Sequence, residues 1–360
     1  MSEARPAIAA IAPRTYREAT SPPTSGEAGS PRTYREVGVD LDGKAALLRS
    51  LGPLVRSTLP AGASGFGAFA GILRLPAGLV LAVTTDGVGT KVLLARRCGR
   101  DRVVGADAVH HCANDLAAAG ARPLFFADYL AMGRLDARVV TAVVEGMAAA
   151  CRALGIPLLA GETAEMPDTY REDAYDVVGM MVGLVDASPH AGPPRPGDVV
   201  LGLAADGLHT NGYSLARRLV ADVDLDRYDP ALGATPADAL LAPHRCYATA
   251  LASLRRLHPV RAAAHITGGG LAGNLVRVLP PDVAVRLDPT WPVPPVFRWL
   301  QRRGAVAEEE MRRVFNMGIG MAVIVPPERA AAARDHLEAA GERCWVIGHV
   351  EAGQGEVRFG

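Results

Sequence analysis

A proline-rich segment divides this chain into two halves, and each half alternates strand and helix patterns. Residues 188–197 hold four prolines and two glycines, a composition typical of a linker. On both sides, short apolar runs predict buried strands, and apolar residues at helical spacing predict helices between them. Strands and helices mixed in both halves predict an α/β or α+β fold. The length of 360 residues agrees with two domains of roughly 150 residues each.

The domain boundaries follow from changes in composition. We expect residues 1–33 to be a disordered tail, because they are rich in Pro, Ser, Thr and Gly and bury little apolar surface. The hexapeptide PRTYRE occurs at 13–18 and again at 31–36, and we assign it no function. The N-terminal domain is expected over 34–187 and the C-terminal domain over 198–360.

Hydrophobic periodicity predicts the main elements of both domains. In the first domain we expect a helix at 42–57, a second helix between an Asp136 cap and Gly155, and strands at 79–85, 124–128, 156–160 and 175–185. In the second we expect strands at 198–203, 265–267, 319–325 and 344–350, and helices at 213–220 and 328–340.

Charge, hydropathy and cysteine usage exclude several classes of protein. The 38 basic and 38 acidic residues cancel, whereas a protein that holds nucleic acid through its net field is normally basic. No apolar run reaches the roughly 18–20 residues that span a bilayer, and the N-terminus lacks a signal-peptide core. The five cysteines form no CxxC pair, which argues against a disulfide framework. We therefore expect a cytoplasmic protein that binds neither nucleic acid nor membranes.

Three acidic motifs lie near predicted strands or helices of the first domain. Residues 84–91 (TTDGVGTK) place the Asp86 carboxylate for Mg²⁺ and the Lys91 ammonium for phosphate just after a strand. Lys91 is one of only two lysines in the chain, which favours a specific role. The alternative is a simple strand-exit turn with a surface lysine.

The other two motifs are weaker when taken singly. Residues 105–115 (GADAVHHCAND) precede an alanine-rich helical stretch, and their carboxylates are either ion ligands or helix caps. The adjacent His110 and His111 point in different directions on any regular element, so we do not expect them to share a metal. Residues 161–167 (GETAEMP) follow a strand with two carboxylates, which suit a cation, acid–base chemistry or capping.

The second domain carries motifs suited to an anion. Residues 205–214 (ADGLHTNGYS) join a strand to a helix, and free amides at a helix N-terminus suit a phosphate. His209 in this motif is a candidate acid or base near neutral pH. The run Gly268-Gly269-Gly270 offers backbone amides for an anion, although such runs are usually flexible turns.

Taken in order, these motifs resemble those of the aminoimidazole ribonucleotide synthetase family over residues 34–357. The matching stretches are TTDGVGTK, NDL with PLFF, GETAEMP, HTNGYS, HITGGG and FNMGIG. The resemblance implies an N-terminal ATP-binding domain whose strands close a barrel with those of a second subunit, and a C-terminal α/β domain packed beside it. It implies a homodimer that converts formylglycinamidine ribonucleotide to aminoimidazole ribonucleotide, with ATP and Mg²⁺, through an imidate phosphate in de novo purine biosynthesis.

The resemblance also implies roles for individual residues. Gly65, Phe66 and Gly67 match a glycine-rich loop over the nucleotide, and Asp107 and Asn114 match the neighbouring segment. Mg²⁺ is expected at Asp86, Asp115 and Glu162. Lys91 is expected at the phosphates and His209 in proton transfer. The ribonucleotide is expected at Thr210, Asn211, Ser214, Gly268, Gly269 and Gly270.

This sequence departs from the usual family pattern at a few positions. Ala160 replaces a glycine, Asp168-Thr169 replaces a common Gly-Met, and 62–65 holds fewer glycines than usual, which puts the mobility of that loop in doubt. Two alternatives remain. One is an ATP-binding pseudoenzyme, which the presence of all four of Asp86, Lys91, Asp115 and Glu162 disfavours. The other is a superfamily relative with another substrate, such as thiamine monophosphate, selenide or the preceding purine intermediate, which the motifs disfavour.

Overall fold

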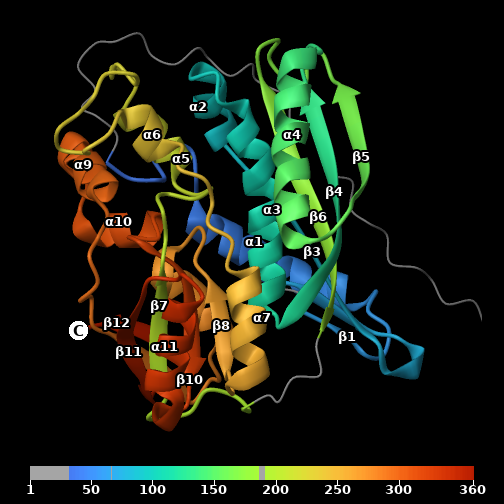
Figure 1. Ribbon diagram of the computed structural model, residues 1–360, viewed down its shortest axis with the longest axis vertical. Helices are drawn as coiled ribbons and strands as arrows, with labels where there is room; N and C mark the ends of the chain where they lie inside the picture. The colour runs from blue at the N-terminus through green and yellow to red at the C-terminus, as the bar shows by residue number, and fades with distance from the viewer. Residues whose placement is uncertain (1–31, 66, 186–190) are drawn as a thin grey trace, which may run out of the picture. The chain divides into compact units, whose positions relative to one another are not determined.

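Two six-stranded sheets, one in each half of the chain, form the framework of the protein (Figure 1). The structure is a computed structural model that describes residues 32–65, 67–185 and 191–360. All of the described residues belong to one compact unit. Residues 1–31 of the predicted tail, 188–190 of the predicted linker and the site residue Phe66 lie outside the described residues.

The first sheet has one parallel pair of strands and is otherwise antiparallel. Its strand order is β1 (Ala63–Ser64), β2 (Gly71–Arg74), β3 (Val80–Gly87), β6 (Tyr175–Val185), β4 (Ala121–Met132) and β5 (Leu158–Glu165). The helices of this half are α1 (Leu41–Arg56), α2 (Lys91–Arg97), α3 (Asp101–Ala118) and α4 (Ala137–Leu154). Since α3 contacts β3, β4 and β6, it covers the centre of the sheet, and α4 packs on α3 (Figure 1).

The second sheet lies in the other half and is also mostly antiparallel. Its strand order is β12 (Glu356–Phe359), β9 (Val283–Leu287), β11 (Cys344–Ala352), β7 (Val199–Ala204), β10 (Ile319–Val325) and β8 (Ala262–His265). Every residue of β10 is buried, so both faces of this sheet are covered at that strand. The helices are α5 (Tyr213–Leu219), α6 (Pro236–Leu240), α7 (Ala248–Leu257), α8 (Gly270–Leu275), α9 (Pro295–Gly304), α10 (Glu308–Val314) and α11 (Ala330–Ala339).

The mixed helix and strand content predicted for both halves is confirmed, and so are most of the elements. The helix predicted between Asp136 and Gly155 is α4, where the Asp136 carboxylate accepts hydrogen bonds from two first-turn amides and Gly155 ends the helix with φ 68°. All five cysteines are unpaired, as expected. Among the described residues, no helix combines the length and the apolar character that a membrane crossing requires.

Three predictions of local structure were wrong. The strand predicted at 265–267 lies earlier in the chain, since β8 ends at His265. Residues 105–115 lie inside α3, and Asp115 is in its last turn, so it does not cap a helix start. The strand predicted at 156–160 runs on to Glu165, because residues 160–165 pair in parallel with β4. Glu162 therefore lies within a strand and not beyond its end.

One face of the first sheet is buried and the other reaches solvent. Along β6, Val177, Gly179 and Met181 are buried, whereas Val178, Met180 and Val182 between them are exposed or half-buried. The neighbouring strands β3 and β4 have the same buried and solvent-reaching faces, since side chains of directly paired residues lie on the same face of a sheet. The solvent-reaching face is thus largely apolar.

Helices α3 and α4 approach so closely that both contribute a glycine to the contact. A Cβ on Gly105 would lie 1.9 Å from the carbonyl oxygen of Val143, and one on Gly146 would lie 2.0 Å from that of Arg102. Backbone atoms cannot yield as a side-chain tip can, so the helices would have to separate.

We therefore expect Gly105→Ala to lower the free energy of unfolding by at least about 2 kcal/mol. The control is Gly273→Ala in α8, where a Cβ would meet nothing within 4 Å and where alanine should stabilise by up to about 1 kcal/mol. Denaturant unfolding measures both. Equal effects of the two substitutions would contradict the close helix contact.

Candidate functional site

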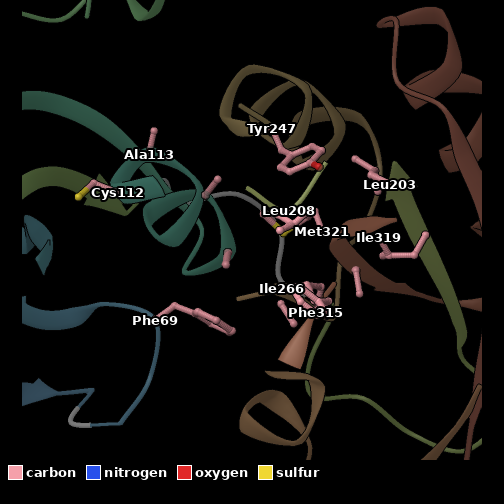
Figure 2. Close-up of a cluster of buried hydrophobic side chains, with 14 of the residues drawn as sticks. Phe69, Cys112, Ala113, Leu203, Leu208, Tyr247, Ile266, Phe315, Ile319 and Met321 are labelled. Atoms are coloured by element: carbon pink, nitrogen blue, oxygen red, sulfur yellow. The ribbon is translucent and has the colours of Figure 1, made fainter. Parts of the chain in front are cut away.

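A cluster of buried histidines and carboxylates lies where α3 meets the second half of the chain. Helix α3 contributes His111 and Asp115, β8 contributes His265, and His209 and His244 come from irregular segments after β7 and α6. Figure 2 shows a cluster of buried hydrophobic side chains, among them Cys112, Leu208 and Ile266. Each of these three is next in sequence to a histidine of the cluster.

Hydrogen bonds join the side chains of the cluster in a chain that begins at Asp86 on β3. His111 Nε2 lies 3.0 Å from Asp86 Oδ2, and His111 Nδ1 lies 2.9 Å from Thr210 Oγ1. Thr210 Oγ1 lies 3.5 Å from His244 Nδ1, and the Nε2 atoms of His244 and His265 are 3.0 Å apart.

At the other end of the chain, the ring of His265 meets Asp115. His265 Nδ1 is 2.8 Å from Asp115 Oδ1, and Thr84 Oγ1 donates to Asp115 Oδ2 at 3.1 Å. Because a carboxylate only accepts, His265 donates from Nδ1, and in the neutral ring Nε2 then carries a lone pair. The adjacent His110 turns elsewhere, to the carbonyl oxygen of His244 at 2.6 Å, so the prediction that His110 and His111 diverge is confirmed.

The histidines of the cluster differ in protonation. Burial lowers the pKa of His111, but the attraction of Asp86 and the hydrogen bond to it outweigh burial and raise the pKa to about 9. Burial raises the pKa of Asp86, but the same pair holds it at about 2. Burial and the neighbouring positive charges lower the pKa of His209 and His244 well below the ordinary value, and burial also lowers that of His265. At neutral pH, His111 is charged and the other three rings are neutral.

Lys91 and Asp107 form a completely buried ion pair with an Nζ–Oδ2 distance of 2.6 Å. Lys91 Nζ also donates to the carbonyl oxygen of Ala242 at 3.0 Å, and Asp107 Oδ1 accepts from the amide of His244 at 2.8 Å. Both residues therefore bind main-chain atoms of the second half of the chain. Burial lowers the pKa of Lys91 and raises that of Asp107, against their mutual attraction.

Asn114 holds the same segment further along α3. Its Nδ2 donates to the carbonyl oxygen of Arg245 at 2.8 Å, and its Oδ1 accepts from the amide of Tyr247 at 2.7 Å. Three side chains predicted for the nucleotide site are thus bound to the backbone of residues 242–247. Figure 2 places Tyr247 among the buried side chains at this contact.

The predicted substrate residues lie beside the cluster. Asn211 Nδ2 donates to Thr210 Oγ1 at 3.3 Å, and Ser214 Oγ lies 3.1 Å from Thr90 Oγ1. Gly268 is next to the Asn211 side chain, since a Cβ there would lie 3.2 Å from its Oδ1. Gly269 and Gly270 follow with φ values of 99° and 61°, at the start of α8.

The glycine loop is bound to the second half by a residue that the sequence analysis missed. Arg277 donates to the carbonyl oxygens of Gly67 at 3.2 Å and Ala68 at 2.8 Å, and its guanidinium lies over the Phe69 ring. Burial lowers the pKa of Arg277, while Asp115 and Asp86 raise it. In this loop Gly65 has φ 107°, and a Cβ there would lie 2.4 Å from the carbonyl oxygen of Ala70.

Glu162 is separated from the cluster within one chain. It is exposed on β5. The path from Asp86 to Glu162 crosses four paired strands: Asp86 pairs with Gly179, Gly179 with Asp128, and Asp128 with Gly161, which precedes Glu162. Three strand spacings correspond to about 14 Å. A cavity of about 730 Å³ in the first half, lined by Arg96, Arg134 and Tyr175 among others, contains none of the predicted site residues.

The donor set of Asp86 and Asp115 fits Mg²⁺. Both offer the hard carboxylate oxygens that this ion prefers. Asp86 is half-exposed, and each carboxylate oxygen has a second lone pair beyond its present partner. Both carboxylates lie near the His111 ring, since His111 Nε2 is 3.0 Å from Asp86 Oδ2 and the ligand atoms of His111, Asp115 and His265 lie within 4.8 Å of one another.

Family models match both halves of the chain. The model "AIR synthase related protein, N-terminal domain" matches residues 67–185, and "AIR synthase related protein, C-terminal domain" matches 195–360. A phosphoribosylformylglycinamidine cyclo-ligase of Cupriavidus taiwanensis is 45% identical over 348 residues, 93% of this chain and 98% of the relative. One of Nitrosospira multiformis is 47% identical over 328 residues, 89% of this chain and 93% of the relative.

Solved structures share the fold at lower identity. The protein tt0281 from Thermus thermophilus is 24% identical with a TM-score of 0.63, over 88% of this chain and 96% of that chain. The hydrogenase maturation protein HypE in complex with ATP is 20% identical with a TM-score of 0.59, over 89% and 92%. On the family models and the curated relatives together, the chain belongs to the phosphoribosylformylglycinamidine cyclo-ligase family, whose product is aminoimidazole ribonucleotide (AIR).

Proposed function

We infer that this chain is the ATP-dependent ligase that converts formylglycinamidine ribonucleotide to 5-aminoimidazole ribonucleotide, ADP and phosphate in de novo purine biosynthesis. The observation that carries this inference is the 44–47% identity to curated cyclo-ligases over most of both chains. The pseudoenzyme and other-substrate alternatives are not favoured by these relatives. We further propose that the enzyme is cytoplasmic, with domains over 34–187 and 198–360.

The chemistry requires activation of a poor leaving group. Transfer of the γ-phosphoryl group to the amide oxygen gives an imidate phosphate, which the amidine nitrogen of the same substrate attacks before phosphate leaves. Holding both reacting groups in one site lowers the activation barrier, because the entropy of bringing them together is lost on binding and not in the reaction step. When bound, Mg²⁺ neutralises charge on the transferring phosphoryl group, and we propose that Asp86 and Asp115 hold it.

We propose that His209 accepts the proton that the attacking nitrogen loses. Its ring is neutral because its pKa is well below the ordinary value, so it is a base and not an acid at neutral pH. Neither of its ring nitrogens has a hydrogen-bond partner among the described residues. Thr210 is next to His209 in sequence and bonds to Asn211, which lies beside Gly268, and this supports the proposed contact of Thr210, Asn211, Ser214 and the glycines 268–270 with the ribonucleotide.

The roles of Lys91 and Glu162 are proposed in a more limited form. Lys91 is buried against Asp107 and bound to the carbonyl oxygen of Ala242, so it reaches phosphate only if its ion pair with Asp107 opens. In its present position, we propose that Lys91 fixes the segment 242–247. Glu162 lies three strands from Asp86, so the two carboxylates of one chain do not share an ion. Gly65 and Gly67 are proposed to cover ATP.

The direct test mixes the purified chain with formylglycinamidine ribonucleotide, ATP and Mg²⁺ and follows aminoimidazole ribonucleotide by its diazo colour, with ADP in parallel. We expect equal amounts of both products and neither without Mg²⁺. Asp86→Asn is expected to lower kcat by about 100-fold or more, because several kcal/mol of charge stabilisation is lost. The control Asp222→Asn changes an exposed carboxylate paired with Arg303 and should keep full activity.

Two other outcomes would each contradict the inference. ADP without aminoimidazole ribonucleotide would indicate a relative with another acceptor. Bound ATP with neither product would indicate a pseudoenzyme.

We also propose that the solvent-reaching face of the first sheet is the homodimer interface and completes a barrel with the second subunit. The support is an apolar ladder across three strands, in which Val83 pairs with Val182 and Val182 with Phe125. Leaving such a face in water is unfavourable, and a symmetric partner buries it twice.

Val83→Glu is therefore expected to weaken the dimer by about 100-fold or more, because each subunit would bury an unpaired charge. Light scattering after size exclusion measures the state. The control is Val346→Glu in β11, which is more exposed (48% against 38%) but lies on the other sheet. A dimer that survives Val83→Glu and dissociates with Val346→Glu would place the interface elsewhere.

A further inference from the structure

Three histidine rings from three separate segments converge inside the second half of the chain. His209, His244 and His265 are all buried, and each offers a ring nitrogen that lies within 4.8 Å of the other two. The rings of His209 and His244 are stacked, with centroids 4.1 Å apart and an interplanar angle of 19°. We propose that these three imidazoles bind a zinc-like transition-metal ion, in addition to the Mg²⁺ expected at the carboxylates.

The packing of His209 gives the first argument. Its ring is 1% exposed, and yet both of its nitrogens lack a hydrogen-bond partner among the described residues. A buried polar group without a partner is costly, and such groups in native proteins need an explanation. Proton transfer to substrate explains one nitrogen of one ring, but it does not explain why two further imidazoles stand beside it.

The environment of His265 gives the second argument. Its Nδ1 donates to Asp115 at 2.8 Å, which leaves the Nε2 lone pair directed at His244. A carboxylate that accepts from the far side of a metal-binding imidazole is the usual support of a histidine–metal site, because it orients the ring and raises its basicity. The supporting residue Asp115 lies on α3, far from the three histidines in the sequence.

The third argument is the spacing of two of the donor nitrogens. In a tetrahedral zinc site with bonds of about 2.0–2.1 Å, neighbouring ligand nitrogens lie about 3.4 Å apart. The Nε2 atoms of His244 and His265 are 3.0 Å apart. The proton on His244 Nε2 shifts to Nδ1, which faces Thr210 Oγ1 at 3.5 Å, so the ring stays neutral and binds with no net proton release.

The chemistry of the donors sets the selectivity. Imidazole nitrogen favours zinc, cobalt, nickel and copper, whereas Mg²⁺ favours oxygen and stays hydrated. The nitrogen site and the carboxylate pair therefore select different ions, although Asp115 supports both. Since His209 is the proposed base, an ion on its ring would block proton transfer, and this consequence alone rests on the proposed function.

Cobalt is the probe, because tetrahedral Co²⁺ absorbs visible light much more strongly than octahedral Co²⁺ does. The full chain, freed of metal by a chelator, is titrated with Co²⁺ in the absence of substrates, and Zn²⁺ is then added. We expect one Co²⁺ per chain with tetrahedral bands that one equivalent of Zn²⁺ removes. His244→Gln is expected to bind at least about 10-fold more weakly.

The control is His336→Gln, in the other close histidine pair of this half. His336 lies 5.3 Å from His258 between ring centroids and bonds to Ser253, and it belongs to neither of the groups of converging ligands found among the described residues. Its affinity for Co²⁺ should equal that of the unchanged chain. Thermal melting of both variants checks that they are folded.

X-ray absorption of the zinc-loaded, unchanged chain counts imidazole ligands without any substitution. Fewer than three imidazoles, a thiolate ligand, or equal affinity in folded His244→Gln would overturn the proposal. Since binding is measured without substrates, its failure leaves the cyclo-ligase assay untouched. In that assay, one equivalent of Zn²⁺ should inhibit the unchanged chain far more than it inhibits His244→Gln.

Discussion

Lys91→Met is expected to lower the free energy of unfolding by about 3–5 kcal/mol. The substitution leaves Asp107 completely buried without its counter-charge and removes the hydrogen bond from Lys91 Nζ to Ala242. Removal of one member of a buried pair costs this much because the remaining charge loses both water and partner. Urea unfolding at neutral pH measures the loss.

The double variant Lys91→Met with Asp107→Asn separates the two contributions. Asparagine removes the orphaned charge and keeps an oxygen for the amide of His244, so we expect the double variant to recover to within about 2 kcal/mol of the unchanged chain. If Lys91→Met instead loses less than about 1 kcal/mol while kcat falls steeply, Lys91 reaches the phosphates as the family resemblance implies, and the buried pair is not its main role.

The free energy of unfolding is expected to fall steeply as the pH drops below about 6.5. His209, His244 and His265 have lowered pKa values in the folded chain, so below their ordinary pKa the unfolded chain binds protons that the folded chain does not. Stability then rises with pH, by at most about 4 kcal/mol per pH unit for three protons. Denaturant unfolding between pH 5 and 8, in a metal-free buffer, gives the slope.

The variant His244→Gln should lower this slope by about one proton's share, roughly 1.4 kcal/mol per pH unit. His336→Gln is again the control and should leave the slope unchanged. A slope that is the same in His244→Gln and in the unchanged chain would mean that His244 takes up its proton as readily in the folded chain as in the unfolded one.

On the alkaline side, the sign is opposite. His111 has a pKa raised to about 9 by Asp86, so its contribution is complete below about pH 6.5 and is lost as the pH rises through 9. The loss should be on the order of 2 kcal/mol, because Asp86 is half-exposed and solvent screens the pair. Stability should therefore peak near neutral pH, and His111→Gln should remove the alkaline decline.

Elements with one buried face were predicted well from the sequence. Helix α4 carries its apolar residues at helical spacing, begins at a capping aspartate and ends at a glycine in the left-handed region. The last long strand of the first half, β6, was also predicted with the correct ends. In both cases the local signals of composition and capping agree with the final packing.

Helix α3 and the site on it were not predictable in the same way. The helix is buried on nearly all sides, and the positions that face the second half are polar, so the apolar spacing that marks a helix is absent. The partners of these polar side chains are backbone groups more than a hundred residues away, which have no signature in the sequence. His244 was missed for this reason, since only the folded chain brings it to His209 and His265.

The contact between α3 and residues 242–247 has a consequence for protein engineering. The side chains of Lys91, Asp107 and Asn114 form hydrogen bonds with main-chain carbonyl and amide groups. Every residue except proline has both groups, so this contact depends on the course of the backbone and not on the side chains of residues 242–247. The main-chain bonds to residues 244 and 245 therefore do not depend on which side chains stand there. The side chains have separate tasks, because the buried His244 ring belongs to the histidine cluster and Arg245 pairs with Glu342 and Asp206. Exchange of His244 would thus remove a metal ligand and leave the main-chain contact between the two halves in place.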